Sequence, residues 1–240
     1  MMLNSSNSPK SITNYNRNIE HLFFRYDIPK NSDSSLDVIA LNKELNPDFI
    51  IDLIRCYDDY QNINNTDFNQ YRIPVLVDYL EKSHKYYIDK RLPEIEQCLD
   101  KLIKQESNPL TYLILNFFEE YKFDLISHFD KEDNLIFPFC KSLFNYRYYK
   151  TESDLVYITK NGANAMRFIN DHHKSKDELK KLQDILIKYK APVKNLSFFQ
   201  IFIQQLSLFE KDLKIHAEIE DNILEKKIKA INQELNISYA

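Results

Sequence analysis

Apolar side chains recur along this chain at intervals of three and four residues, the spacing of one face of an α-helix. After a polar opening, two brief helices are expected within about residues 19–62. Four long amphipathic segments follow and predict four long helices. The first begins at Pro74, and the others cover about residues 110–147, 162–190 and 195–235. Pro93 and Pro138 lie inside the first two, where proline should bend or restart a helix.

The composition favours helices joined by few turns and excludes several functions. The single glycine, Gly162, is too little for glycine-rich phosphate loops or for a sheet with many tight turns. A net charge of −4 with scattered basic residues indicates no nucleic-acid surface. The polar opening is not a secretory signal, and no apolar run approaches the roughly 18 residues of a membrane span. Three widely spaced cysteines indicate reduced thiols used in packing, so a cytoplasmic protein without a membrane partner is expected.

Three regions are expected along the chain. Residues 1–18, rich in Ser and Asn, are predicted to be a disordered tail. Residues 19–66 are predicted to form a small helical N-terminal domain that ends in a polar linker, and residues 67–240 a four-helix bundle. The predicted fold class is therefore all-α.

Four histidines share the apolar faces of the long segments. Each of His84, His128, His172 and His216 has apolar neighbours at helical spacing on both sides. Glu132 and Glu220 follow two of them by four residues and therefore share their faces. Six side chains that can bind a metal are thus expected to point inward.

An internal repeat relates these residues to one another. The segments "DLISHFDKEDN" (124–134) and "DLKIHAEIEDN" (212–222) share the pattern D-L-x-x-H-x-x-x-E-D-N at an offset of 88 residues. The same offset carries His84 onto His172. At a rise of about 1.5 Å per residue, each pair of helices returns to a similar level, so all six side chains can converge in one layer of the bundle.

The chemistry of this set favours a transition-metal site. An unpaired buried carboxylate costs several kcal/mol, which a bound cation removes. Four imidazoles and two carboxylates without a thiolate favour non-haem metal over structural zinc, and six ligands suit two ions with bridging carboxylates. Two iron ions are predicted, with manganese as the alternative. An oxo or hydroxo bridge would leave a position for dioxygen, nitric oxide or water.

Several assignments stay open at this point. Each histidine taken alone could be a hydrogen-bonded core residue, with its glutamate as a surface partner. His173 competes with His172 as a ligand, although the helical phase favours His172. Asp124 and Asp212, one turn ahead of their histidines, could accept a hydrogen bond from the ring nitrogen that faces away from the metal. Packing is favoured over redox chemistry for Tyr86 and Tyr87.

Taken together, the motifs resemble the hemerythrin-like domain of the repair-of-iron-centres family, di-iron proteins that help restore iron–sulfur clusters damaged by nitric oxide or peroxide. The resemblance covers about residues 70–230 and includes "RLPEI" after His84 and "LIFP" after Glu132. It also includes Asp171-His172 with a leucine seven residues later, and the final H-x-x-x-E of His216. Oxygen-carrying hemerythrins have an H-x-x-x-H that is absent here. The resemblance implies a hemerythrin-like four-helix bundle with a di-iron centre on the six residues.

Two departures from the family concern the ends of the chain. The N-terminal segment is similar to a small helical domain that carries a Cys-Cys pair in many members, but this chain reads "PKNS" there. The last helix has "LEKKI" where the family tends to show Phe-Pro. The missing cysteine pair argues against a thiol-dependent step.

The resemblance implies a cytoplasmic stress protein that repairs, or donates iron to, damaged iron–sulfur proteins. The alternative is a sensor or scavenger that binds dioxygen or nitric oxide at the di-iron centre. A metal-free helical scaffold is a third hypothesis, and peroxide reduction is also compatible with an open coordination position.

Overall fold

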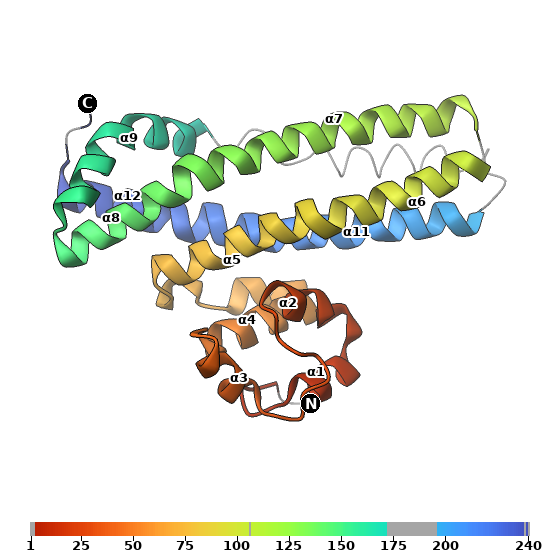
Figure 1. Cartoon of the computed structure of the whole chain (residues 1–240), viewed down its shortest axis with the longest axis horizontal. Helices are drawn as coiled ribbons and strands as arrows, with labels where there is room; N and C mark the ends of the chain where they lie inside the picture. Colours follow the sequence, from red (N-terminus) through yellow and green to blue (C-terminus); the bar gives the residue numbers. More distant parts are fainter. Residues whose placement is uncertain (1–2, 106, 172–195, 238, 240) are drawn as a thin grey trace. The chain divides into compact units, whose positions relative to one another are not determined.

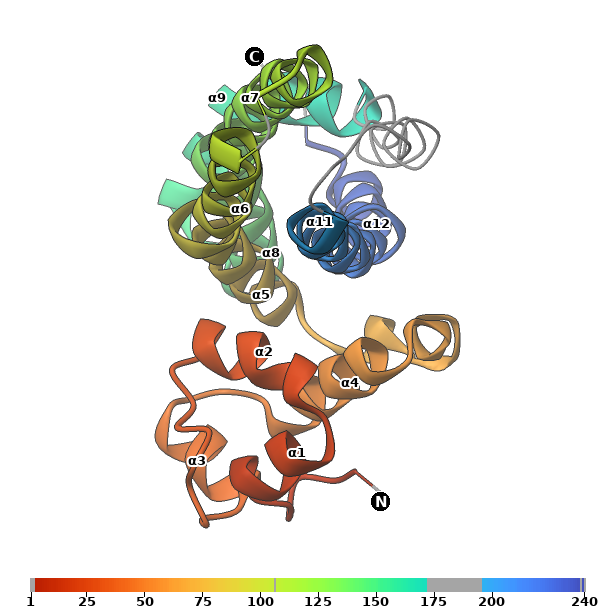
Figure 2. The same ribbon diagram turned by 90° about the vertical axis from the view of Figure 1, so that its right-hand side faces the viewer.

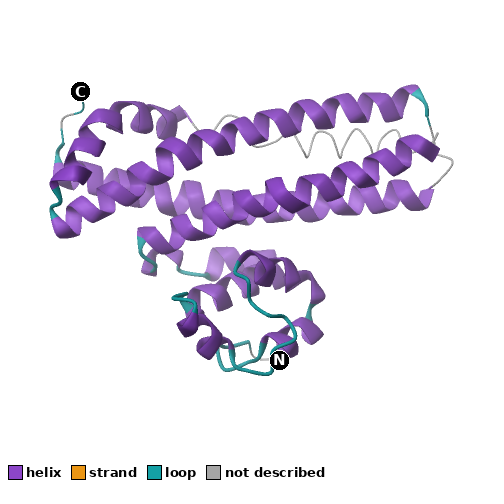
Figure 3. Cartoon of the chain, viewed as in Figure 1, coloured by secondary structure: helices purple, strands orange, loops and turns teal. Residues whose placement is uncertain are grey.

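The computed structural model describes residues 3–105, 107–171, 196–237 and 239. Within them the chain forms helices and no strand, which confirms the all-α class (Figure 3). No helix in this part of the chain combines the length and the apolar character that crossing a membrane requires. The chain divides into two compact units. Two of the boundaries fall inside helices, α5 (Ile73–Tyr86) and α11 (Leu196–Ala217), and the third follows Leu224. The hemerythrin-like four-helix bundle stays a prediction.

The first unit comprises Met1–Ser83 and Lys214–Leu224. Besides the first part of α5 and the end of α11, it contains short helices that Figure 1 shows from red to orange. The α-helices are α1 (Pro9–Tyr15), α2 (Glu20–Arg25), α3 (Leu36–Asn42) and α4 (Pro47–Asp58). The 3₁₀ helices are η1 (Arg17–Ile19), η2 (Tyr60–Asn65) and η3 (Phe68–Gln70), and the π-helix is η7 (Glu218–Leu224).

The beginning of the chain differs from the expected disordered tail. Ser8 caps α1 by accepting a hydrogen bond from the Ser11 N–H, and Pro9 occupies the first turn, where its missing N–H is tolerated. Ile12 is fully buried. The apolar side chains are few, but one of them is enough to anchor the short helix in a core.

A buried polar network holds α5 in the first unit. Arg25 of α2 is almost fully buried, and its Nη1 donates to the Tyr57 hydroxyl and to Ser83 Oγ, both at 3.0 Å. The hydroxyls of Tyr57 and Tyr79 share a hydrogen bond of 2.9 Å. The network therefore fixes α2 and α4 against α5, and Ser83 directly precedes His84 in the sequence.

The second unit comprises His84–Leu213 and Glu225–Ala240. Its α-helices, apart from the shared α5 and α11, are α6 (Leu92–Gln105), α7 (Pro109–Lys131), α8 (Phe137–Tyr149), α9 (Glu152–Asp171) and α12 (Glu225–Leu235). Two π-helices, η4 (Tyr87–Arg91) and η5 (Glu132–Ile136), interrupt the long helices.

The core of the second unit lies between α6, α7 and α11, which run side by side in both views (Figures 1 and 2). Buried residues recur every three or four positions on α6 and α11, as the sequence pattern predicts, and on α7 the partly buried Tyr121 and Leu125 continue the stripe between Phe118 and Phe129. They are Leu92, Ile95, Leu99 and Leu102 from α6, Ile114, Phe118 and Phe129 from α7, and Phe199, Phe202, Leu206 and Phe209 from α11.

The long segments agree with three of the four predictions. Helix α5 begins at Ile73, one residue before Pro74; α7, η5 and α8 are continuous over 109–149, and α11, η7 and α12 over 196–235. The third helix, α9, begins at Glu152 instead of near residue 162. Gly162 lies inside α9 and does not begin it. The rest of the third predicted segment lies outside the described residues.

Each of the two prolines predicted to perturb a helix is preceded by a π-helix. Pro93 and Pro138 are the second residues of α6 and α8, directly after η4 and η5. Proline lacks an N–H and collides with the carbonyl one turn earlier, and the wider π turn moves that carbonyl away. The third π-helix, η7, is followed by no proline. Since η5 and η7 both contain the Glu-Asp-Asn of the repeat, proline is not their common cause.

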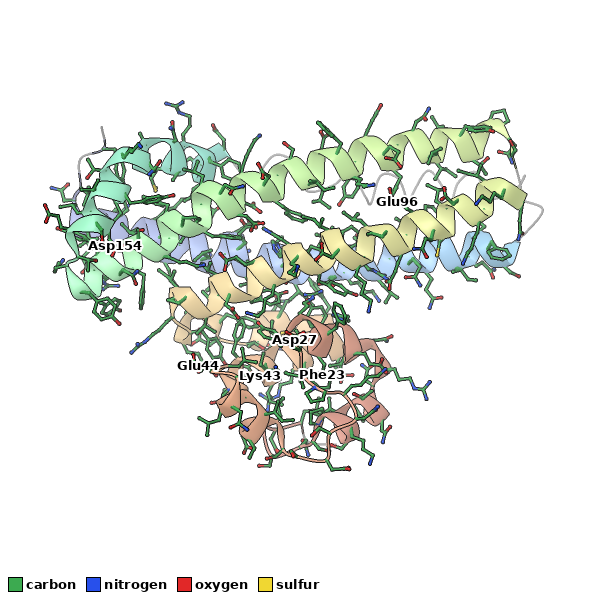
Figure 4. The ribbon with its side chains drawn as sticks, in the orientation of Figure 1. Phe23, Asp27, Lys43, Glu44, Glu96 and Asp154 are labelled. Atoms are coloured by element: carbon green, nitrogen blue, oxygen red, sulfur yellow. The ribbon has the colours of Figure 1, made fainter. Side chains whose placement is uncertain are left out.

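A chain with one glycine must place other residues where the backbone is left-handed. Asp27, Glu44, Lys150 and Asn236 have φ values of 51°, 56°, 54° and 47°. Asp27 and Glu44, labelled in Figure 4, lie just after α2 and α3, and Lys150 is the C-cap of α8. Each costs about 1 kcal/mol relative to glycine.

The single glycine sits against an aromatic ring. A Cβ on Gly162 would collide with the ring of Tyr239, whose hydroxyl donates to Asn232. Glycine inside a helix otherwise costs about 1 kcal/mol relative to alanine. We therefore expect Gly162→Ala to stabilise the Tyr239→Ala variant by about 1 kcal/mol. In the natural background it should be neutral or destabilising. Urea unfolding of the four proteins measures the coupling, and an equal effect of Gly162→Ala in both backgrounds would contradict the contact.

Candidate metal centre

Glu132 of the second unit lies between two imidazole rings. Its Oε1 is 2.7 Å from His128 Nε2, and its Oε2 is 3.3 Å from His84 Nε2. Glu132 and His84 are fully buried, whereas the His128 side chain keeps 27% of its exposure. Helix α7 supplies His128, η5 begins with Glu132, and the end of α5 supplies His84. Two of the six predicted ligands, His84 and His128, therefore contact the carboxylate of a third, Glu132.

The second nitrogen of the His84 ring also lies against a carboxylate. His84 Nδ1 lies 2.8 Å from Asp133 Oδ1. The ring stacks on Phe129, with centroids 4.0 Å apart, and lies 5.3 Å from Phe137. Two carboxylates and two aromatic rings thus fix both the position and the rotation of this imidazole.

The two carboxylates determine the protonation of His84. Burial alone lowers the pKa of an imidazole, because it disfavours the charged form. Hydrogen bonds to Asp133 and Glu132, together with their negative charges, outweigh burial and raise the pKa of His84 above its ordinary value of 6.5. Folding therefore favours the protonated form of this ring more than water does.

The donors fit a metal in chemistry, but they do not by themselves complete a site. Ligands about 2.1 Å from one ion and at right angles lie about 3 Å apart, close to the two imidazole–Glu132 distances. Neutral imidazoles and carboxylates suit iron and manganese. Among the described residues, however, no group of three or more His, Cys, Asp or Glu is arranged to hold an ion. Further ligands are therefore needed to close the site.

The second copy of the repeat places its histidine and glutamate inside the first unit. His216 and Glu220 are both nearly buried, with His216 Nδ1 3.7 Å from Glu220 Oε2. The ring of Tyr79 lies 6.3 Å from the His216 ring. The His-x-x-x-Glu of this copy therefore puts both side chains on one buried face, as the sequence predicts. His172 and the competing His173 lie outside the described residues, and the choice between them stays open.

Asp212 and Asp124, the two acidic residues that could orient a histidine, differ in burial. Asp212 is buried, and its Oδ1 accepts a hydrogen bond of 2.7 Å from the Tyr87 hydroxyl. Asp124 is exposed. Asp133 holds His84 instead, and sequence reasoning missed it. The signal was present, because both copies of the repeat continue Glu-Asp-Asn.

The three cysteines form no disulfide with one another: Cys56 and Cys140 are buried, and Cys98 is half-buried. Burial raises the pKa of Cys56 to about 11, although a contact with Thr66 opposes the shift. Since the thiolate is the nucleophile, we expect iodoacetamide at pH 8 to modify Cys98 at least tenfold faster than Cys56 and Cys140. Peptide mass spectrometry after timed quenching measures the three rates, with urea-unfolded protein as control. Rapid labelling of Cys56 in the folded protein would contradict its burial.

The fold and the site define an all-helical protein with two imidazoles gathered on a buried carboxylate. Its sequence is similar to the iron-sulfur cluster repair protein ScdA of two Staphylococcus epidermidis strains, with 21% identity over 186 residues in both. The similar region covers 74% of this chain and 79% of each relative. No family model matches the chain, and no solved structure matches it significantly.

Proposed function

We propose that the chain is a non-haem di-iron protein that repairs iron–sulfur clusters, or donates iron to them, under nitrosative or oxidative stress. The observation that carries the proposal is the buried Glu132 with His84 and His128 on its two oxygens. The similarity to ScdA supports the repair role, since ScdA is described as an iron–sulfur cluster repair protein. Bound iron would supply the redox chemistry and an open coordination position.

Each proposed ligand has its own part. Glu132 would hold iron through its carboxylate, because each of its oxygens faces one imidazole. His84 and His128 would bind through Nε2, the atom that each turns toward Glu132. The sequence repeat extends the set to His172, His216 and Glu220, which makes four imidazoles and two carboxylates. The aromatic rings of Phe129 and Phe137 would keep water from His84.

A repair assay tests the proposal. Protein from iron-supplied cells should contain about two irons per chain. It should restore activity to a nitric-oxide-damaged cluster enzyme while a chelator removes free iron. A His128→Ala variant, which loses the partly exposed ligand, is the matched control. Iron-loaded protein that fails to restore the enzyme, yet changes its spectrum reversibly with nitric oxide or dioxygen and keeps its iron, would replace repair by gas binding. The missing Cys-Cys pair favours that alternative.

A further inference from the structure

The imidazole of His84 has a carboxylate at each of its two nitrogens. Asp133 Oδ1 lies 2.8 Å from Nδ1, and Glu132 Oε2 lies 3.3 Å from Nε2. These carboxylates belong to consecutive residues at the start of η5. In an α-helix, neighbouring side chains point about 100° apart. The wider π turn reduces that angle, which helps both residues to reach one ring.

The two contacts differ in what they require of the ring. An ionised carboxylate only accepts hydrogen bonds, so Asp133 requires a proton on Nδ1. A neutral imidazole carries one proton, and Nε2 then presents its lone pair toward Glu132. A lone pair facing a carboxylate is repulsive unless a cation lies between them or nearby. Asp133 therefore makes Nε2 the atom that binds the cation.

At Nδ1, the His84 nitrogen that faces away from Glu132, the contact is with Asp133. Carboxylates that hold the far nitrogen of a ligating histidine fix its tautomer and raise its basicity, and their loss typically lowers metal affinity by 10–100-fold. Asp133 has the position, distance and charge for this role.

We propose that Asp133 is a positioning residue of the metal centre: it holds the His84 ring with the proton on Nδ1 and so directs Nε2 to the metal. The proposal rests on the proposed function for the metal, but the orientation of the ring can be tested without metal.

The first test reads the tautomer in metal-free protein. Histidine labelled with ¹⁵N is observed by NMR at a pH where the ring is neutral, and the His84 signals are assigned with a His84→Gln variant. The natural protein should show His84 protonated on Nδ1. Asp133→Ala should shift the ring toward the Nε2–H form. Glu120→Ala, which removes an exposed carboxylate from α7, is the control and should leave the tautomer unchanged.

The second test measures metal affinity by competition between the protein and a chelator for Fe²⁺ under anaerobic conditions. Asp133→Ala should lower the affinity about 10–100-fold. Asp133→Asn keeps an acceptor oxygen but not the charge. Its affinity for Fe²⁺ should lie between the affinities of Asp133→Ala and of the natural protein. Glu120→Ala should change the affinity less than threefold.

The outcomes separate the two claims. An Asp133→Ala variant with unchanged tautomer and affinity overturns the role of Asp133, even if the natural protein binds iron. A natural protein that binds no iron, but whose His84 tautomer depends on Asp133, overturns the proposed function and upholds the orientation of the ring.

Discussion

Replacing Glu132 by glutamine is expected to lower the iron content from the proposed two ions per chain to less than half an ion per chain. Glutamine has nearly the same shape, but it is neutral, and its NH₂ group cannot ligate a metal. Glu132 is in contact with both His84 and His128, so the change affects two ligands at once. The affinity for iron should therefore fall more than 100-fold. This loss should exceed the loss in His128→Ala, because the natural His128 ring is partly exposed.

Thermal unfolding separates a metal effect from a folding defect. Iron at about 100 times its dissociation constant stabilises a protein by about 2.7 kcal/mol. For a chain of this size that corresponds to a rise in Tm of roughly 5–10 °C. The natural protein should show this rise, and the glutamine variant should not. Glu120→Gln, at an exposed position of α7, is the control and should keep both its iron and the shift. Full iron content in Glu132→Gln would exclude Glu132 as a ligand.

The features that the sequence predicts are those that depend on helical periodicity. The stripes that include His84, His128 and His216 follow from the 3.6-residue repeat, and the described helices bury them largely as expected. His128 and Glu132 could be placed together because residues four apart share a face of a helix. The contact of His84 with Glu132 joins two helices, whereas the convergence of all six residues stays a prediction.

The features that the sequence did not predict depend on local departures from that periodicity. The residue after a ligand should point away from it in an α-helix, so Asp133 was not considered for His84. The π-helix η5 changes that geometry, and no composition rule marks it. The third helix was expected to begin near residue 162, but Gly162 lies inside α9, against the ring of Tyr239. Asp212 pairs with Tyr87 across 125 residues, which no periodic pattern encodes.

The metal-free protein should lose stability as the pH rises through the pKa of His84. That pKa is raised above 6.5 in the folded chain, since hydrogen bonds and charge from Asp133 and Glu132 outweigh burial. A raised pKa means that folding favours the protonated ring. Its contribution to stability is complete below pH 6.5 and disappears as the pH rises through the folded value. Urea unfolding of metal-free protein between pH 6 and 9 measures the loss, and His84→Gln should remove this part of the pH dependence.

The affinity for iron should show the opposite dependence on pH and rise as the pH rises, because the metal and the proton compete for the same Nε2 atom. Below the raised pKa of His84, iron binding must release that proton. The affinity for iron should therefore fall by up to tenfold for each unit by which the pH is lowered. Chelator competition for Fe²⁺ at several pH values gives the slope, and proton release measured in weak buffer gives the stoichiometry. Binding without proton release below the raised pKa would show that the metal does not displace the proton of His84. In the proposed site, iron and a proton would thus be alternative cations at His84 Nε2, the nitrogen that faces Glu132.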